Sequence, residues 1–146
     1  NAQIKAKMLS AIKCGLTPIV CVGESLRQRE AGGAMDIVET QLEECLIDEV
    51  SKDNCIIAYE PVWAIGTGQT AEPEDIEEIH SHIRNTLKAK VSDSDGIPIL
   101  YGGSVKPENA SKILALPDVG GALVGGASLN PKDFLAIINT TSGLSK

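Results

Sequence analysis

Four short, almost continuously apolar runs constrain the fold of this 146-residue chain more than any other feature. Each run is followed by a glycine-bearing turn and then by a helical pattern. A strand that is apolar at every position is typical of a parallel sheet covered on both faces. Alternation of such strands with helices indicates the α/β class. The predicted strands span residues 17–22, 54–59, 97–101 and 120–124.

The spacing of apolar residues predicts five helices, one before the first strand and one after each strand. They span residues 2–14, 35–50, 74–91, 106–116 and 131–139, and Asn1 is a candidate cap for the first helix. Four strand–helix units do not close an eight-stranded barrel, so they form an open sheet or half a barrel. No linker-like stretch divides the chain, which predicts a single domain over residues 1–146.

The charge balance argues against two classes of partner. Lys and Arg number 13 against 20 Asp and Glu, so the net charge is −7. An acidic chain is a poor ligand for nucleic acid or for an anionic membrane. No apolar run is long enough to cross a bilayer, and the first residues lack the apolar stretch of a signal peptide. We therefore expect a cytoplasmic protein that binds neither nucleic acid nor membrane.

The four cysteines fit the same compartment. No pair has the CxxC spacing of a metal or redox site, and each cysteine lies in an apolar or helical run. We therefore expect buried free thiols in a reducing cytoplasm. The residues are Cys14, Cys21, Cys45 and Cys55.

Glycine and small residues concentrate where the predicted strands end. In parallel α/β folds, ligands bind at the carboxyl ends of the strands. Glycine lets backbone N–H groups approach an anion closely, and a following helix adds a positive dipole. The alternative is a set of tight turns without a ligand. Two glycine pairs on successive units, at Gly103-Ser104 and Gly125-Gly126, favour a phosphate site.

Glu60 ends the second predicted strand and shares one strand face with Ile56 and Ala58. A carboxylate at that position is a candidate general base, although an ordinary ion pair explains it equally well. The glycine-rich segment from Pro61 to Ala71 predicts a hinged lid. An ordinary surface loop would not explain the exposed Trp63-Ala64-Ile65 that this segment is expected to carry.

Several separate stretches together resemble the triosephosphate isomerase family. AYEPVWAIGTGQTA at residues 58–71 is similar to that family's signature, and VCVGES at residues 20–25 to its fifth strand end. YGGSV at residues 101–105 and LVGGASL at residues 123–129 are similar to its two phosphate loops. The resemblance covers nearly the whole chain. It implies the C-terminal half of a TIM (β/α)8 barrel, with strand–helix units five to eight.

The resemblance also implies an activity and a base. The family interconverts dihydroxyacetone phosphate and glyceraldehyde 3-phosphate, without a metal or an organic cofactor, in glycolysis and gluconeogenesis. Glu60 matches the base that moves a proton between neighbouring carbons of the substrate. The backbone N–H groups expected to hold the substrate phosphate are those of Gly66, Ser104, Gly125 and Gly126.

Further roles follow for the lid between Pro61 and Ala71. Ile65 and Leu123 match an apolar clamp that desolvates Glu60, which would make that carboxylate more basic. Trp63 matches the residue that contacts Glu24 when the lid is open. Tyr101 and Ser104 match the residues that hold the lid when it is closed. Cys21 matches the cysteine beneath the site, and Gln69 stands where a lysine is common.

Two catalytic residues of the family find no match in these 146 residues. They are a lysine after the first strand and an electrophilic histidine after the fourth. His80 and His82 cannot replace them, since residues two apart do not share a helix face, and we expect both to be at the surface or partly buried. The family is usually a homodimer through a loop of its first half, and that loop has no counterpart here either. We therefore expect this chain to self-associate, or to need the missing N-terminal half, with weak or no activity alone.

Two other functions remain open at this point. One is another phosphate-binding barrel, such as an epimerase or a protein of the tryptophan synthase α-subunit type. Such proteins share the late phosphate cradle but do not need the EPVWAIGTG stretch. The other is a non-catalytic half-barrel that binds phosphate or assembles without turnover, which the absence of the lysine and histidine favours.

Overall fold

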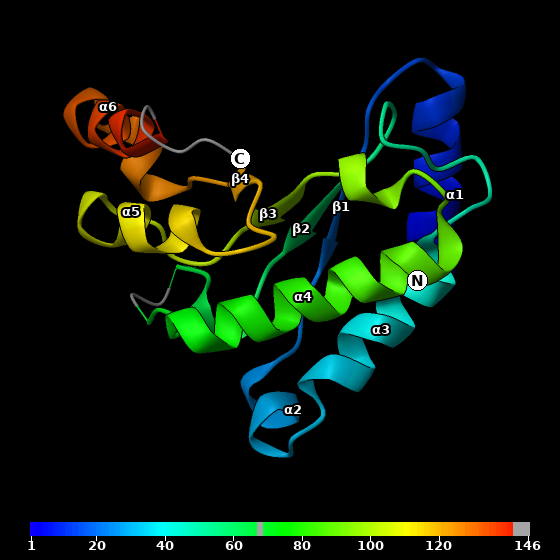
Figure 1. Ribbon diagram of the computed structural model, residues 1–146, viewed down its shortest axis with the longest axis horizontal. Coiled ribbons are helices and arrows are strands. Elements are labelled where there is room, and N and C mark those ends of the chain that lie inside the picture. The colour runs from blue at the N-terminus through cyan, green and yellow to red at the C-terminus, as the bar shows by residue number, and fades with distance from the viewer. Residues whose placement is uncertain (67–68, 142–146) are drawn as a thin grey trace.

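Four parallel strands form one sheet in the order β1-β2-β3-β4, so that each strand pairs with the next one in the chain (Figure 1). The computed structural model describes residues 1–66 and 69–141. The strands are β1 (Ile19–Val22), β2 (Ile56–Tyr59), β3 (Ile99–Tyr101) and β4 (Gly121–Ala122). This topology confirms the predicted parallel α/β class and leaves β1 and β4 at the two edges of the sheet.

All five predicted helices are present. They are α1 (Ala2–Lys13), α3 (Ala34–Cys45), α4 (Pro73–Lys90), α5 (Pro107–Ala115) and α6 (Pro131–Thr140). Helix α4 packs against α3, and α5 packs against α6 (Figure 1). Helix α4 begins with a proline and two acidic residues and ends with lysines in its last turn, as the helix dipole favours.

Four short elements were not predicted from the sequence. One is helix α2 (Leu26–Glu30), which begins at Ser25; the N–H of Ser25 donates to Gln28 Oε1 over 2.8 Å. The others are the 3₁₀ turns η1 (Val62–Ala64), η2 (Ser94–Gly96) and η3 (Gly126–Leu129). Elements of three to five residues are too short to show a helical period.

Some predicted boundaries were wrong. The helix expected over residues 35–50 ends at Cys45, because Leu46 is extended. Leu46 and Val50 are nevertheless buried, so their apolar character reflects packing in the core and not a continued helix. The amide of Asn1 does not cap α1; its Nδ2 donates to Glu44 Oε2 over 2.6 Å.

His80 is fully buried, so the expectation that it lies at the surface or is partly buried was wrong. It shares the inner face of α4 with Ile76 and Ile83, one turn to each side. Its Nδ1 lies 3.2 Å from the carbonyl oxygen of Asp118. His82 is half-buried, and its Nε2 lies 3.4 Å from a carboxylate oxygen of Glu39.

The cysteine prediction was half right. All four thiols are free, and Cys45 and Cys55 are buried, whereas Cys14 and Cys21 are exposed. Cys21 lies on the edge strand β1, where no further strand of the described chain covers it. Across residues 1–66 and 69–141, no helix is both long and apolar enough to cross a membrane.

Large apolar side chains are exposed at both ends of the sheet. Helices α1 and α6 lie at these opposite ends in Figure 1. The exposed residues there are Ile4, Leu16 and Ile19 at the β1 end, and Phe134, Leu135 and Ile138 on α6. The sheet therefore ends in two apolar margins.

Candidate active site

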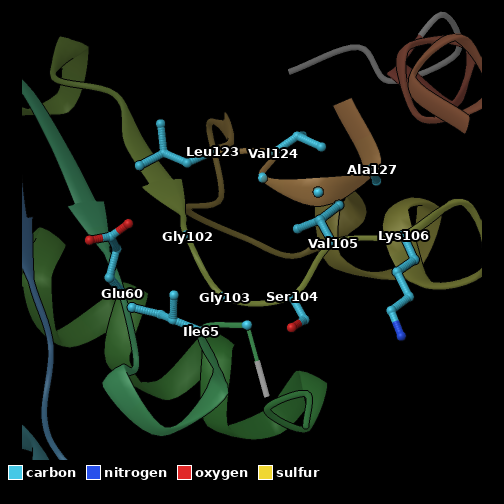
Figure 2. Close-up of a pocket in the computed structure, with 13 residues that line it drawn as sticks. Glu60, Ile65, Gly102, Gly103, Ser104, Val105, Lys106, Leu123, Val124 and Ala127 are labelled. Carbon is cyan, nitrogen blue, oxygen red and sulfur yellow. The ribbon is translucent and has the colours of Figure 1, made fainter. Parts of the chain in front are cut away.

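A cavity of about 490 Å³ lies beside the carboxyl ends of β2, β3 and β4 (Figure 2). Glu60 lies at one side of it, Ser104 lies toward the other, and the side chain of Lys106 extends away from Glu60. The predicted site residues that line the cavity are Glu60, Ile65, Gly66, Ser104, Leu123, Gly125 and Gly126. One cavity therefore gathers the candidate base, every candidate phosphate ligand and both clamp residues.

The position of Glu60 depends on two glycines from neighbouring strand ends. The N–H of Glu60 donates to the carbonyl oxygen of Val22 over 2.7 Å, which continues the β1–β2 ladder. A Cβ atom at Gly23 would lie 1.8 Å from the Glu60 carbonyl oxygen, and one at Gly102 would lie 2.5 Å from Glu60 Cγ. Both distances are far below van der Waals contact. Only glycine at these positions leaves room for Glu60.

We expect Gly23→Ala to lower the free energy of unfolding by at least about 1–3 kcal/mol, the usual cost of overpacking. The added methyl group meets a backbone carbonyl, which cannot rotate away as a side chain could. Urea unfolding followed by circular dichroism measures the change. Gly33→Ala is the matched control, because a Cβ atom there meets only the Gln28 carbonyl oxygen at 3.5 Å. Equal stability of the two variants would contradict the close approach.

Cys21 lies beside the Glu60 carboxylate at the β1 edge. Although Cys21 is exposed as a whole, partial desolvation of its sulfur, together with the charge of Glu60 and a hydrogen bond to it, raises the pKa of Cys21 to about 11. The thiol is therefore protonated at neutral pH and donates to the carboxylate. A thiol in that state is a poor nucleophile, so Cys21 is not a candidate for covalent catalysis.

Backbone donors are available across the cavity from Glu60. Within residues 1–66 and 69–141, no hydrogen bond uses the N–H of Ser104, Gly125 or Gly126 as its donor. The hydroxyl of Ser104 donates to the carbonyl oxygen of Ala64 over 2.8 Å and so ties the two loops together. Three N–H groups without an acceptor among the described residues, on residues that line one cavity, form an arrangement that suits an anion.

The segment after Glu60 is held away from the cavity at Trp63. The indole Nε1 donates to Glu24 Oε1 over 2.9 Å, the contact that the resemblance assigns to an open lid. Glu24 is fully buried, which the sequence did not indicate. The expected exposure of residues 63–65 was wrong in part. Trp63 is half-buried and Ala64 is fully buried, and only Ile65 is exposed.

Four predicted site residues lie outside the cavity lining, namely Pro61, Trp63, Ala71 and Tyr101. Tyr101 is buried beneath the loop after β3, where a Cβ atom at Gly103 would lie 2.1 Å from the tyrosine hydroxyl. The pKa of Tyr101 lies above its ordinary value, mainly because the hydroxyl is buried. A hydrogen bond with the backbone of Ala71 opposes this shift without cancelling it. Residues 67 and 68, at the centre of the predicted lid, lie outside the described residues.

The cavity also contains residues to which sequence reasoning gave no individual role. They are Gly102, Val105, Lys106, Val124 and Ala127, beside Gly103 of the first predicted glycine pair. All of them lie within or next to the two phosphate-loop motifs, and that position was the available signal. Among the residues that the structure describes, no group of three or more His, Cys, Asp or Glu side chains is arranged to hold a metal ion.

Comparisons with known proteins agree on one family. The family model described as triosephosphate isomerase matches residues 1–141. Triosephosphate isomerase of Xanthobacter autotrophicus is 52% identical over 142 residues, which cover 97% of this chain and 56% of that protein. The enzyme of Caulobacter vibrioides is 53% identical over 139 residues, which cover 94% of this chain and 55% of that protein.

A solved structure gives the same result. The crystal structure of triosephosphate isomerase from Bartonella henselae matches with a TM-score of 0.88 at 40% identity, over 95% of this chain and 56% of that one. The fold is therefore that of half a TIM barrel, and the chain spans little more than half the length of these relatives. Since the family model covers nearly the whole chain, we conclude that the chain belongs to the triosephosphate isomerase family.

Proposed function

We propose that this chain supplies the base and the phosphate cradle of a triosephosphate isomerase. The enzyme would interconvert dihydroxyacetone phosphate and D-glyceraldehyde 3-phosphate through an enediolate. One observation carries the proposal: Glu60 lines the same cavity as Ser104, Gly125 and Gly126, whose N–H groups have no acceptor among the described residues. A base opposite an anion cradle is the arrangement that proton transfer on a short phosphorylated sugar requires.

Glu60 performs the central step. Its carboxylate takes a proton from the hydroxymethyl carbon of the ketone, and the electron pair of that C–H bond forms the enediolate. The same carboxyl group then returns the proton to the neighbouring carbon, and a hydroxyl proton moves to the former carbonyl oxygen. These proton transfers require neither a metal ion nor a redox partner. We therefore propose that no cofactor is required.

The remaining cavity residues hold the substrate and exclude water. The backbone N–H groups of Gly66, Ser104, Gly125 and Gly126 bind the phosphate. Ile65 and Leu123 provide apolar walls, and a carboxylate that loses water on ligand binding becomes a stronger base. Closure of the segment from Pro61 to Ala71 would bring Ile65 over the ligand, with Tyr101 and Ser104 as its closed-state partners.

Full turnover also needs an electrophile that polarises the substrate carbonyl. The resemblance assigns no residue of this chain to the family's lysine and histidine roles. We propose that these groups come from four further strand–helix units that complete the barrel against the β1 and β4 edges. The partners are then a triose phosphate and those units. The setting is glycolysis and gluconeogenesis in the cytoplasm.

A second candidate function is phosphate binding without turnover. It is favoured by the two open sheet edges, which leave Cys21 and the β1 side of the site exposed. Under this function the chain binds phosphate or assembles through its sheet edges. Mixing it with the remaining units of a barrel would then produce no isomerase activity.

A coupled isomerase assay distinguishes the two functions. The purified chain is assayed alone and after mixing with the part of the Xanthobacter autotrophicus isomerase that lies outside the matched region. We expect little or no turnover from either part and measurable turnover from the mixture. A stable complex that binds phosphate but shows no turnover would instead support the non-catalytic function.

Phosphate binding can be tested on the chain alone. We expect millimolar inorganic phosphate to shift the amide NMR signals of Ser104, Gly125 and Gly126, because these residues line the cavity and their N–H groups have no acceptor among the described residues. The amide of Gly33, which donates to the Gln28 carbonyl oxygen away from the cavity, serves as the control signal. Shifts confined to other parts of the chain, with these three signals unmoved, would reject the cradle.

A further inference from the structure

Arg29 joins two carboxylates and a tryptophan that come from three separate parts of the chain. Its Nη1 lies 3.1 Å from Glu24 Oε1, after β1. Its Nη2 lies 2.5 Å from Asp75 Oδ1, in the first turn of α4. Its guanidinium carbon lies 5.4 Å from the centre of the Trp63 ring, a distance that allows a cation–π contact. We call these four residues the Arg29 clamp.

Glu24 makes this clamp energetically significant. A fully buried carboxylate is stabilised only when a cation or strong donors pair with it. Arg29, Tyr59 and Trp63 all donate to the same oxygen, Glu24 Oε1. Across the described residues, the other oxygen, Oε2, has no hydrogen-bond partner. The position of Oε1 therefore depends on Arg29, and the hydrogen bond of Trp63 depends on Oε1.

Asp75 fixes the other side of the guanidinium group. The side chain of Arg29 is 19% exposed and that of Asp75 is 38% exposed, so their ion pair is only partly screened by water. A planar guanidinium group can contact both carboxylates at once, which the single ammonium of a lysine does less well. Helix α4 follows the far end of the segment from Pro61 to Ala71, while Trp63 lies near its start. Arg29 thus links the two ends of that segment.

We propose that Arg29, held by Asp75, is a positioning residue that sets how firmly Trp63 is retained on Glu24. Weakening the Asp75–Arg29 pair loosens Trp63 and the adjoining residues Ile65 and Gly66, which line the cavity. The retention of Trp63 is a property of the unliganded chain. The consequence for ligand closure rests on the proposed function, since it requires the segment to move toward a bound phosphate.

Trp63 reports on its own retention, because it is the only tryptophan in the chain. Acrylamide quenching of its fluorescence measures how often the indole leaves Glu24. We expect Asp75→Asn, without ligand, to raise the ratio of released to retained Trp63 by about 1.5- to fivefold, the range for loss of a partly exposed ion pair. Arg29→Lys should act in the same direction. Added salt should raise quenching in the parent chain more than in Asp75→Asn, since salt screens the ion pair.

Glu74→Gln is the matched control. Glu74 and Asp75 both lie in the first turn of α4, so each substitution removes one negative charge from the same helix terminus. Glu74 belongs to none of the ion pairs among the described residues, and we expect its variant to quench like the parent chain. Circular dichroism checks that each variant folds. If Asp75→Asn does not fold, the salt dependence of the parent chain decides.

The outcomes separate the clamp from the proposed function. Quenching in Asp75→Asn equal to or lower than in the parent chain, equal effects of Asp75→Asn and Glu74→Gln, or no salt dependence in the parent chain would overturn the clamp. A higher ratio of released to retained Trp63 in Asp75→Asn supports the Arg29 clamp, independently of any response to inorganic phosphate. Inorganic phosphate is then titrated into each variant. No response of the Ser104, Gly125 and Gly126 amides would count against the proposed function and leave the clamp intact.

Discussion

Glu60→Gln is expected to lower the isomerisation rate of the completed barrel by about 10²–10⁴-fold, the usual contribution of a positioned acid–base group. Glutamine has nearly the same shape as glutamate, so it fits the space that Gly23 and Gly102 leave. Its amide cannot accept the substrate proton. The coupled assay should therefore show a loss in kcat, while phosphate still shifts the amide signals of Ser104, Gly125 and Gly126.

Glu72→Gln provides the control for this change. Glu72 is exposed at the start of α4 and lies outside the cavity lining, so its neutralisation should leave turnover within about twofold, in line with small effects of surface substitutions. A folded Glu60→Gln protein with the parent's turnover would remove Glu60 from the role of base.

The purified chain is expected to associate with itself instead of remaining a monomer. Edge strands β1 and β4 expose unpaired backbone groups, which template pairing with other chains. Leu16 is 64% exposed and Ile19 is 46% exposed at the β1 edge, and such apolar margins favour contact with another surface. Light scattering after size-exclusion chromatography should give a mass above that of one chain, and the mass should fall on dilution.

Two variants test whether the β1 edge drives this association. Ile19→Glu should shift the distribution toward monomer, because a charge on the edge strand opposes pairing. Leu26→Glu replaces a leucine on α2 that is 45% exposed, nearly as much as Ile19, and should leave the distribution unchanged. A monodisperse monomer of the parent chain, or equal effects of the two substitutions, would contradict this prediction.

The strands could be predicted from the sequence because their apolar character is continuous and their ends carry glycine. The structure confirms the order and direction of all four, although pairing at the edge is limited to Gly121 and Ala122. Helix α2 was missed because five residues do not complete a recognisable period. The inner position of His80 agrees with its spacing of four and three residues from Ile76 and Ile83, which places it on the same helix face.

The composition of the cavity could also be predicted in large part. Glu60 and the two glycine motifs stand at strand ends, and the parallel order of the strands brings those ends together. Their chemical roles remain predictions. The Arg29 clamp could not be found from spacing, since the contact between Arg29 and Asp75 joins two helices that are far apart in sequence. Burial of a carboxylate such as Glu24 likewise depends on packing that no local pattern records.

The strictly sequential pairing of the strands has a consequence for biosynthesis. Each strand finds its partner in the preceding unit, so the sheet can grow in the direction in which the ribosome releases the chain. Each pairing closes only one strand–helix–strand unit, although parallel pairing of this kind forms more slowly than a helix or a hairpin. The surroundings of Glu60, from Gly23 to Gly102, need only β1, β2 and β3. The space around Glu60 can therefore be shaped before β4 is translated, whereas Gly125 and Gly126 join the cavity only after that strand.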